Sequence, residues 1–466
     1  MHMRRGLAGT LFALALSCAP LLAADGKDAR AVLVDISRAE AADVEAWRSA
    51  QGVDWWLELG DDLLLSGDVT ALRAAVRSDV ELRDLGKLAP RDLVLHARGC
   101  ALDRTPPDLL VYPGSRYDLL LRPDAQRMAA LGHDDPAHLG AEEWIDVQPD
   151  TVIARQYRFE RPVPLGADPA ITALVAEIDP VRWYADVVTL AGWDRSSYSP
   201  ELADARQWIA ARFASLGLVV SEPAFPLVYS GTTYTPSNVI GFLQGSSRPG
   251  EWVVVGGHYD SRNINNAPSS AADTPGADDN ATGCSAVLEL ARVFSTKRPA
   301  ASMIFMCYAG EEQGLVGGNA HAGALQADGQ LARVRLAAIM DMIGWSANAT
   351  LGADLDTTST FAATRNLFAD AALTYVPGLA VTVSGLTCCS DHMPYINRGR
   401  PSVLSIHKNY TSYVHYHRST DLPANLGPHA QAIGGAIMRM NAAAVAGVVG
   451  PMDAAGDFIF VDGVDF

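Results

Sequence analysis

The chain has 466 residues, of which 53 are Asp or Glu and 36 are Lys or Arg, so its formal net charge at pH 7 is −17. This acidic balance argues against nucleic acid as a partner, because a phosphate backbone requires a basic surface. The length leaves room for two or three domains with a large core. Beyond the N-terminus we expect no apolar run long enough to span a membrane.

The start of the chain has the composition of a secretory signal peptide. A pair of arginines is followed by an apolar stretch and then by two small residues, at Arg4–Arg5, 7–16 and Ala23–Ala24. This order predicts a signal peptide over residues 1–24, which is removed when the protein is secreted to the periplasm or the medium. Two alternatives stay open: an ordinary buried helix, and a lipoprotein anchor at Cys18, whose surroundings fit that pattern less well.

Residues 26–165 show no catalytic constellation, and their pattern predicts a small α+β module. A strand at 31–36 and a helix at 39–51 begin it, and a similar order of elements recurs further along. Its histidines lie far apart among charged residues, and we expect them at the surface: His96, His133 and His138. The module is either a removable pro-region, which we favour slightly, or a permanent accessory domain.

A proline-rich junction at 161–169 marks the predicted domain boundary. From residue 171 to 449 the pattern becomes α/β, because short apolar strands alternate with helical segments. The last of these segments, Ala424 to Val448, predicts a long alanine-rich helix. Residues 450–466 form an acidic tail that is either a sorting or docking tag or a frayed end.

Three strands of this domain end in residues that bind metals or move protons. Apolar runs at 253–257, 303–308 and 336–340 each lead into His, Asp or Glu. Open α/β sheets bind their ligands at the ends of strands. This argument groups the following candidates: His258, Asp260, Asp278, Asp279, Glu311, Glu312 and Asp341, with His417 from a later segment.

The candidates match the ligand chemistry of zinc, which takes imidazole together with carboxylate. Acidic groups packed so densely would repel one another without cations, and two divalent ions about 4 Å apart that share one carboxylate resolve this conflict. Adjacent side chains diverge, so Glu311 and Glu312 are expected to have different roles. For a single residue such as Asp260, a solvated loop position is an equally good interpretation, whereas the ordered set favours a metal site.

The candidates lie in the segments GGHYDS, PGADDNATG, AGEEQGLVGG, MDMIG and YHRSTD. In this order the segments resemble the co-catalytic dizinc exopeptidases, which include bacterial leucyl aminopeptidase, aminopeptidase Y and the catalytic domain of glutamate carboxypeptidase II. The resemblance covers residues 185–448 and leaves out residues 26–165. It implies an α/β fold with a mixed central sheet flanked by helices, and two zinc ions per chain.

The resemblance also implies the metal ligands, residue by residue. His258 and Asp341 would bind one zinc. Glu312 and His417 would bind the other, and Asp279 would bridge the two ions. His415 is a rival for the role of His417, because residues two apart in an extended segment point the same way.

Further roles follow from the same resemblance. Glu311 would be the general base for a water activated by the metals. Asp260 would accept the free N–H of the histidine ligand and so fix its tautomer, and Asp278 would support the turn beside it. His321 and His407 are expected to be non-ligands, and His392 is expected either to be structural or to line the pocket.

The leading function implied by the family is a secreted aminopeptidase that removes N-terminal residues from peptides or proteins. A carboxypeptidase-type relative would need an arginine pocket, and no Arg cluster is obvious between Gly344 and Pro401. A glutaminyl-cyclase-type relative keeps one zinc, for which this ligand set is excessive. A catalytically inactive binding ectodomain is the alternative from another class. The sequence gives no oligomeric state.

Five cysteines remain after removal of residues 1–24: Cys100, Cys284, Cys307, Cys388 and Cys389. Cys284 and Cys307 lie in an apolar helix and an apolar strand, so we expect buried small hydrophobes rather than bridge partners. Cys388 and Cys389 are adjacent, and a bridge between neighbours is strained. We expect one of them to be able to pair with a distant thiol in an oxidising compartment.

Overall fold

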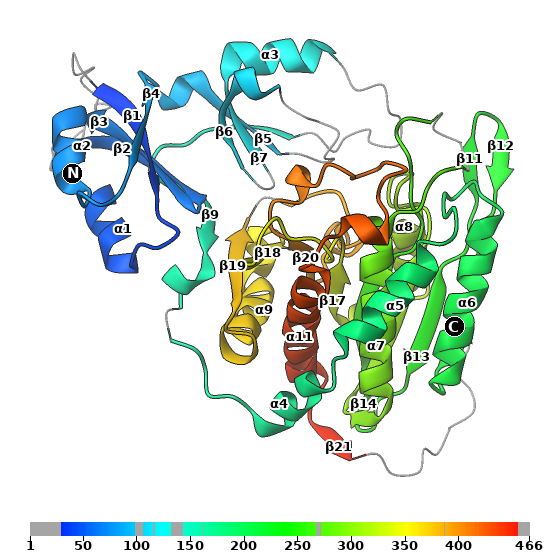
Figure 1. The fold of residues 1–466 in the computed structure, drawn as a ribbon. Helices are drawn as coiled ribbons and strands as arrows, with labels where there is room; N and C mark the ends of the chain where they lie inside the picture. Colours follow the sequence, from blue (N-terminus) through cyan, green and yellow to red (C-terminus); the bar gives the residue numbers. More distant parts are fainter. Residues whose placement is uncertain are drawn as a thin grey trace, which may run out of the picture.

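The fold was taken from a computed structural model of the chain (Figure 1). The structure describes residues 29–97, 106–114, 117–131, 143–161, 163–266, 272–385 and 387–454. The predicted signal peptide with Cys18, the residues Cys100, His133 and His138, and the tail from 455 onward lie outside the described residues.

A mixed sheet of 13 strands runs through the whole molecule. Its strands lie in the order β10 (Val219–Ser221), β13 (Val239–Leu243), β16 (Ala301–Tyr308), β14 (Arg248–His258), β17 (Val334–Met340), β20 (Ser402–His407), β18 (Leu351–Asp356), β19 (Leu379–Ser384), β9 (Thr151–Gln156), β2 (Val53–Gly60), β3 (Asp62–Asp68), β1 (Ala29–Asp35) and β4 (Leu82–Gly86). The expected fold class, a mixed central sheet flanked by helices, is confirmed.

The helices of the described residues are α1 (Ala41–Arg48), α2 (Val69–Ala75), α3 (Arg122–Leu131), α4 (Pro169–Ala176), α5 (Pro180–Leu190), α6 (Glu201–Ser215), α7 (Gly283–Ser295), α8 (Val316–Ala327), α9 (Ala362–Tyr375), α10 (Met393–Ile396) and α11 (Ala430–Val449). α3 packs on strands of the second, smaller sheet. Short strands complete the fold: β5 (Leu93–Ala97), β6 (Leu110–Pro113), β7 (Tyr117–Leu121) and β8 (Glu143–Asp146) form a second sheet, β11 (Leu227–Tyr229) pairs with β12 (Thr232–Tyr234), and β15 (Lys297–Pro299) pairs with β21 (Met452–Ala454).

The centre of the large sheet is parallel. β14 pairs in parallel with β16 and with β17, and β17 pairs in parallel with β20. Parallel strands are covered on both faces and read as continuous apolar runs, which explains why all eight residues of β16 are buried. The carboxyl ends of these strands therefore meet at one edge of the sheet.

The N-terminal part joins the same sheet, and at the left of Figure 1 β9 lies between β19 and the blue strands. β9 pairs antiparallel with β19, with Gln156 opposite Thr382 and Ala154 opposite Ser384. Buried residues from Tyr157 onward share one core, whereas strands β1 to β3 belong to separate clusters. The division into domains at 26–165 and 171–449 stays a prediction.

Three expectations about single residues or segments were wrong. His96 is buried, because its ring stacks on Trp144 with centroids 4.3 Å apart. Met452–Ala454, in the predicted tail, form a strand. α11 has the length and hydropathy of a membrane span, although no such run was expected; however, 78% of its most apolar window is buried in the fold, as in the core helix of a soluble protein.

The expectation that Cys284 and Cys307 are not bridge partners was also wrong, whereas the sequence had not decided the pairing of Cys388 and Cys389. Cys284, in the first turn of α7, forms a disulfide with Cys307 of β16, and their Cα atoms lie 5.5 Å apart. That separation is typical of disulfides, and only the packing of the helix on the sheet produces it. Cys388 and Cys389 pair with each other rather than with a distant thiol.

Candidate metal centre

The parallel strands bring most of the predicted ligands to one edge of the sheet. His258 is the last residue of β14, Asp341 follows β17 directly, and Glu311 and Glu312 follow β16. The first two of these strands are neighbours of each other, and β16 lies on the other side of β14. The structure therefore gathers these side chains as the strand pattern predicted.

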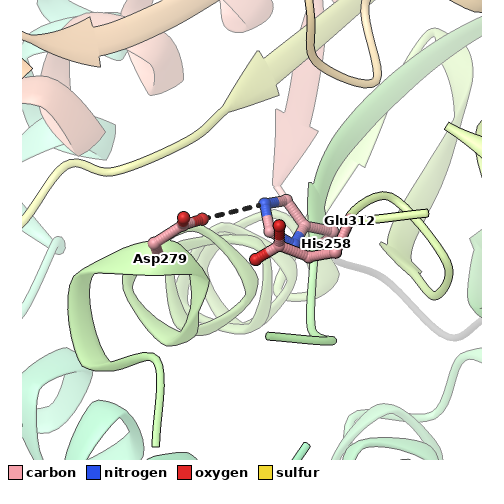
Figure 2. A group of neighbouring side chains, drawn as sticks. All are labelled: His258, Asp279 and Glu312. Atoms are coloured by element: carbon pink, nitrogen blue, oxygen red, sulfur yellow. Dashed lines mark ion pairs between the residues drawn. The ribbon is translucent and has the colours of Figure 1, made fainter. Parts of the chain in front are cut away.

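One half of the site is built around His258, which is 1% exposed. Its Nε2 atom lies 3.5 Å from Asp341 Oδ1, 3.8 Å from Glu311 Oε2 and 3.3 Å from Asp279 Oδ1. Figure 2 shows His258, Asp279 and Glu312 converging from the strand end, the turn before α7 and the loop after β16. The ligand atoms of these three side chains lie close enough together to hold one cation.

The other half is built around His417. Its Nε2 atom lies 2.8 Å from Asp279 Oδ2 and 3.0 Å from Glu312 Oε2. His415, the rival candidate, instead contacts the Thr420 hydroxyl at 2.9 Å. The structure thus places His417, and not His415, among the carboxylates.

Asp279 lies between the two halves, with one carboxylate oxygen toward each histidine. It belongs to an irregular turn, Ala277–Thr282, in which Asp279 and Asn280 leave helical geometry. Asn280 anchors this turn, because its Oδ1 atom accepts the N–H groups of Gly283 and Met342. The turn thereby holds the Asp279 carboxylate between His258 and His417.

Asp260 is completely buried behind the site. The acceptor nearest to His258 Nδ1 is the backbone carbonyl of Asp260 at 3.1 Å, and the Asp260 carboxylate lies at 3.5 Å. That carboxylate also accepts the N–H groups of Glu311 and Glu312, at 3.3 and 3.4 Å, and the hydroxyl of Ser197 at 3.0 Å. Asp260 therefore orients both the histidine and the loop with the two glutamates.

The charges of the site depend on one another. Burial lowers the pKa of His258, but Glu311 and Asp341 outweigh this effect and hold that pKa well above its usual value. Burial raises the pKa of Glu311 well above its usual value, with His258 opposing the shift. Burial also acts on Asp279, but His417 and His258 hold its pKa below the usual range. Bound cations would take over the role of these imidazolium charges.

Two predicted metal ligands have a buried oxygen atom without a hydrogen-bond partner, which fits a metal centre. Glu312 Oε1 and Asp341 Oδ1 are buried and accept no hydrogen bond. Leaving such atoms unpaired costs free energy. Two groups with ligand atoms close enough to share one ion occur among the described residues: His258 with Asp279 and Glu312, and His258 with Glu311 and Asp341.

The other sequence candidates are held in structural contacts. Asp278 accepts the Gly344 N–H at 2.8 Å and lies 2.8 Å from His407 Nε2, which agrees with the structural role expected for it. His321 contacts the Tyr395 hydroxyl at 2.8 Å, and His392 contacts Thr387. None of these contacts reaches the two groups described above.

Three further residues lie next to the site, of which sequence reasoning missed Arg195 entirely and gave the other two no role of their own. Ser390 donates to Asp341 Oδ2 at 2.8 Å. Arg195 and Asp421, both buried, hold the backbone around Asp279. Asp421 ends the Tyr-His-Arg-Ser-Thr-Asp segment, so its spacing from His417 was a signal, whereas nothing in the sequence around Arg195 pointed to the site.

A small pocket opens beside the carboxylates, with a volume of about 30 Å³. Besides the metal-site candidates, its walls are Met342, Cys389, Ser390, Ile406, Tyr410 and Tyr416. None of the described residues lining it is Arg or Lys. The pocket is therefore acidic and mostly polar, with Met342 and Ile406 among its few apolar lining residues.

Comparison with known proteins places the site in a family context. Residues 238–441 match the family model described as peptidase family M28. A probable zinc metalloprotease of Pyricularia oryzae is 38% identical over 166 residues, which cover 32% of this chain and 33% of that protein. A probable zinc metalloprotease of Pyrenophora teres f. teres is 38% identical over 154 residues, covering 30% and 32%. The chain thus matches about a third of the length of these relatives.

Solved structures share the fold at lower identity. LapB from Legionella pneumophila is 18% identical with a TM-score of 0.51, covering 91% of this chain and 100% of that chain. An aminopeptidase from Aneurinibacillus sp. strain AM-1 is 16% identical with a TM-score of 0.50, covering 62% and 98%. At these identities the similarity shows the fold alone.

Proposed function

We propose that this chain, whose residues 238–441 belong to the zinc metallopeptidases of family M28, is a secreted aminopeptidase with two zinc ions. The observation that carries the proposal is the position of Asp279, whose two oxygens lie toward His258 and toward His417. A carboxylate shared between two sets of ligands is what a pair of metal ions requires.

The ligand sets are those implied by the family resemblance, and the short distances between their side chains support them. His258 and Asp341 would hold one zinc, Glu312 and His417 the other, and Asp279 would bridge them. Zinc in such a site lowers the pKa of a bound water and polarises a carbonyl oxygen.

Glu311 has the properties of the general base. Its side chain is 11% exposed at the pocket, and burial raises the pKa of its carboxyl well above the usual value. A base of raised pKa both accepts a proton from the attacking water and returns it to the departing amine. The second transfer completes cleavage of the peptide bond, because an amine leaves only when protonated.

The carboxylates that line the pocket favour a substrate with a free α-amine. A protonated amine is attracted to carboxylates, whereas a substrate C-terminal carboxylate needs a cation. The guanidinium of Arg262 lies 4.0 Å from Glu312 Oε2. This contact keeps a carboxypeptidase-type relative as the second candidate, and Arg262→Ala separates the two.

The first test measures zinc content and substrate class together. Purified protein should contain two zincs per chain and should hydrolyse leucine p-nitroanilide, but not its N-acetylated form. The Arg262→Ala variant should keep this activity. Cleavage of N-acetylated peptides from the C-terminus, abolished by Arg262→Ala, would instead establish the carboxypeptidase.

A separate measurement tests secretion and the fate of the N-terminal part. Intact mass and N-terminal sequencing of the protein recovered outside the expressing cells should show loss of residues 1–24. A mature chain that begins near residue 165 would establish the pro-region. Retention of the protein inside the cells with Met1 intact would contradict the proposed secretion.

A further inference from the structure

Arg195 is completely buried, and its guanidinium donates only to backbone carbonyls in the described contacts. Nε donates to Tyr259 at 2.7 Å, Nη1 to Leu190 and Pro275 at 2.5 and 2.6 Å, and Nη2 to Gly276 at 2.7 Å. Tyr259 follows His258 directly, and Gly276 precedes the turn with Asp279. Arg195 therefore ties one histidine-bearing segment to that turn.

The backbone around Arg195 strengthens this tie. Its carbonyl accepts the N–H of Ser261, and its own N–H donates to Thr274. Gly276 has φ +47°, and a Cβ there would come within 2.4 Å of Ser261 Cβ and 3.1 Å of Arg195 Nη2. Glycine is thus required for the close approach of the three segments.

Asp421 makes the corresponding tie on the other side. Its Oδ1 accepts the Asp278 N–H at 2.9 Å and the Tyr413 hydroxyl at 2.7 Å, and its Oδ2 accepts the Asp279 N–H at 3.0 Å. Its carbonyl accepts the Ala277 N–H at 2.9 Å. Since Asp421 lies four residues after His417, it joins the second histidine-bearing segment to the same turn.

Arg195 also places a positive charge beside a site rich in carboxylates. Burial lowers the pKa of Arg195 to about 10, while Asp421, Asp260 and Asp279 act to raise it. Arg195 therefore stays a cation at neutral pH, and its charge offsets part of the negative charge behind the metal ligands.

We propose that Arg195 and Asp421 are positioning residues that each set the geometry of one metal position. Arg195 holds Asp279 against His258 for the ion bound with Asp341, and Asp421 holds Asp279 against His417 for the ion bound with Glu312. The inference rests on the proposed two-zinc centre. Residues behind metal ligands change metal affinity by about 10- to 100-fold when replaced.

The experiment compares two variants with a matched control pair in the full chain. In Asp421→Asn the side-chain amide has only one acceptor oxygen, so one of the two backbone N–H contacts is lost. Arg195→Met removes the charge and the four hydrogen bonds that the guanidinium donates to backbone carbonyls. Arg195→Lys, which keeps the charge, replaces it in the experiment if Arg195→Met does not fold. The controls are Arg212→Met and Asp186→Asn, a part-buried ion pair at 2.7 Å that contacts no ligand candidate.

Zinc affinities are measured by competition with a chromophoric chelator, and the occupancy of each position by anomalous diffraction from crystals at limiting zinc. Asp421→Asn should weaken the position at Glu312 and His417 by about 10- to 100-fold, with a smaller change at the other. The Arg195 variants should show the reverse selectivity. The control variants should lower thermal stability and leave both zinc affinities unchanged.

The outcomes separate the two proposals. Wild-type protein with two zincs, and variants whose two affinities are unchanged or fall equally, would overturn the positioning roles while leaving the proposed function intact. Equal weakening in the control variants would also overturn them, because it would reflect general loss of stability. A wild-type protein that cannot bind two zincs would overturn both proposals.

Discussion

Glu58 and Glu312 are both buried carboxylates in the large sheet region, but their surroundings differ. Glu58, on β2 of the N-terminal part, is 0% exposed and accepts from Arg155 at 2.7 and 2.8 Å and from Arg48 at 3.1 Å. Glu312 is 4% exposed, lies beside Asp279 and His417, and has one oxygen without a hydrogen bond.

The difference shows that the partners of a buried glutamate decide its role. Glu58 stabilises the fold, whereas Glu312 is available to bind a metal. A carboxylate with fixed guanidinium partners is satisfied within the fold, since arginine is always charged and its fork matches carboxylate oxygens. A carboxylate grouped with other acids and with imidazoles is not satisfied. It becomes so only when a cation is supplied from outside the chain, which is the condition for a metal site.

The largest expected effect is on catalysis, in the candidate metal centre, where the buried carboxylates lack fixed partners. Glu311→Gln keeps the size of the side chain but cannot accept the proton, so kcat should fall by about 10²- to 10⁴-fold. Zinc content should stay that of the wild type, measured on the same preparation. Full activity with bound zinc would show that another group is the base.

Removal of metal should destabilise the site around Glu312 and leave the contacts of Glu58 unchanged. Dialysis against a chelator should lower the free energy of unfolding by about 4 kcal/mol for each zinc, relative to protein held at a thousandfold excess of zinc over the Kd of each site. Urea titrations with and without zinc measure this difference. Unfolding that is indifferent to zinc would mean that the unpaired carboxylates are not satisfied by this metal.

Glu58→Gln tests the carboxylate that has fixed arginine partners. Two arginines would lose their charged partner, and the free energy of unfolding should fall by about 3 kcal/mol, as for other broken buried pairs. Zinc affinity should not change. The exposed pair of Arg30 and Asp84 is the control, because Asp84→Asn should have little effect on stability. A loss of zinc affinity in Glu58→Gln would end the separation drawn between the two regions.

A third kind of buried group has a neutral partner. Burial lowers the pKa of His321, beside the Tyr395 hydroxyl, to about 4, below the value near 6.5 of an unfolded chain. Because the folded pKa is depressed, its contribution to stability is present above pH 6.5 and is lost as pH falls toward 4. Between pH 7 and pH 5 the loss should be about 2 kcal/mol.

The measurement is the free energy of unfolding at both pH values for wild type and for His321→Gln. The variant should lose less stability on acidification, since it has no imidazole to protonate. An equal loss in both proteins would assign the acid sensitivity to other groups.

The position of the site was predictable because its signals are local in the chain. Each parallel strand is a short apolar run, and the residue at its end was readable as His258, Asp341 or the Glu311–Glu312 pair. Parallel strands of one sheet place their carboxyl ends together, so strand pattern and residue type predicted a cluster without knowledge of the strand order. The resemblance to a family then supplied the roles.

The sequence by itself determined the fold class, the residues that gather at the sheet edge and the match of residues 238–441 to the peptidase family M28 model. Tertiary structure alone decided that Cys284 pairs with Cys307, that β9 continues the sheet of β19, and that Arg195 and Asp421 hold the turn with Asp279. The physical reason is the range of the interactions. Strand and turn preferences act between near neighbours in the chain, whereas a disulfide, a strand pairing or a buried side chain that donates to distant carbonyls depends on which segments pack together.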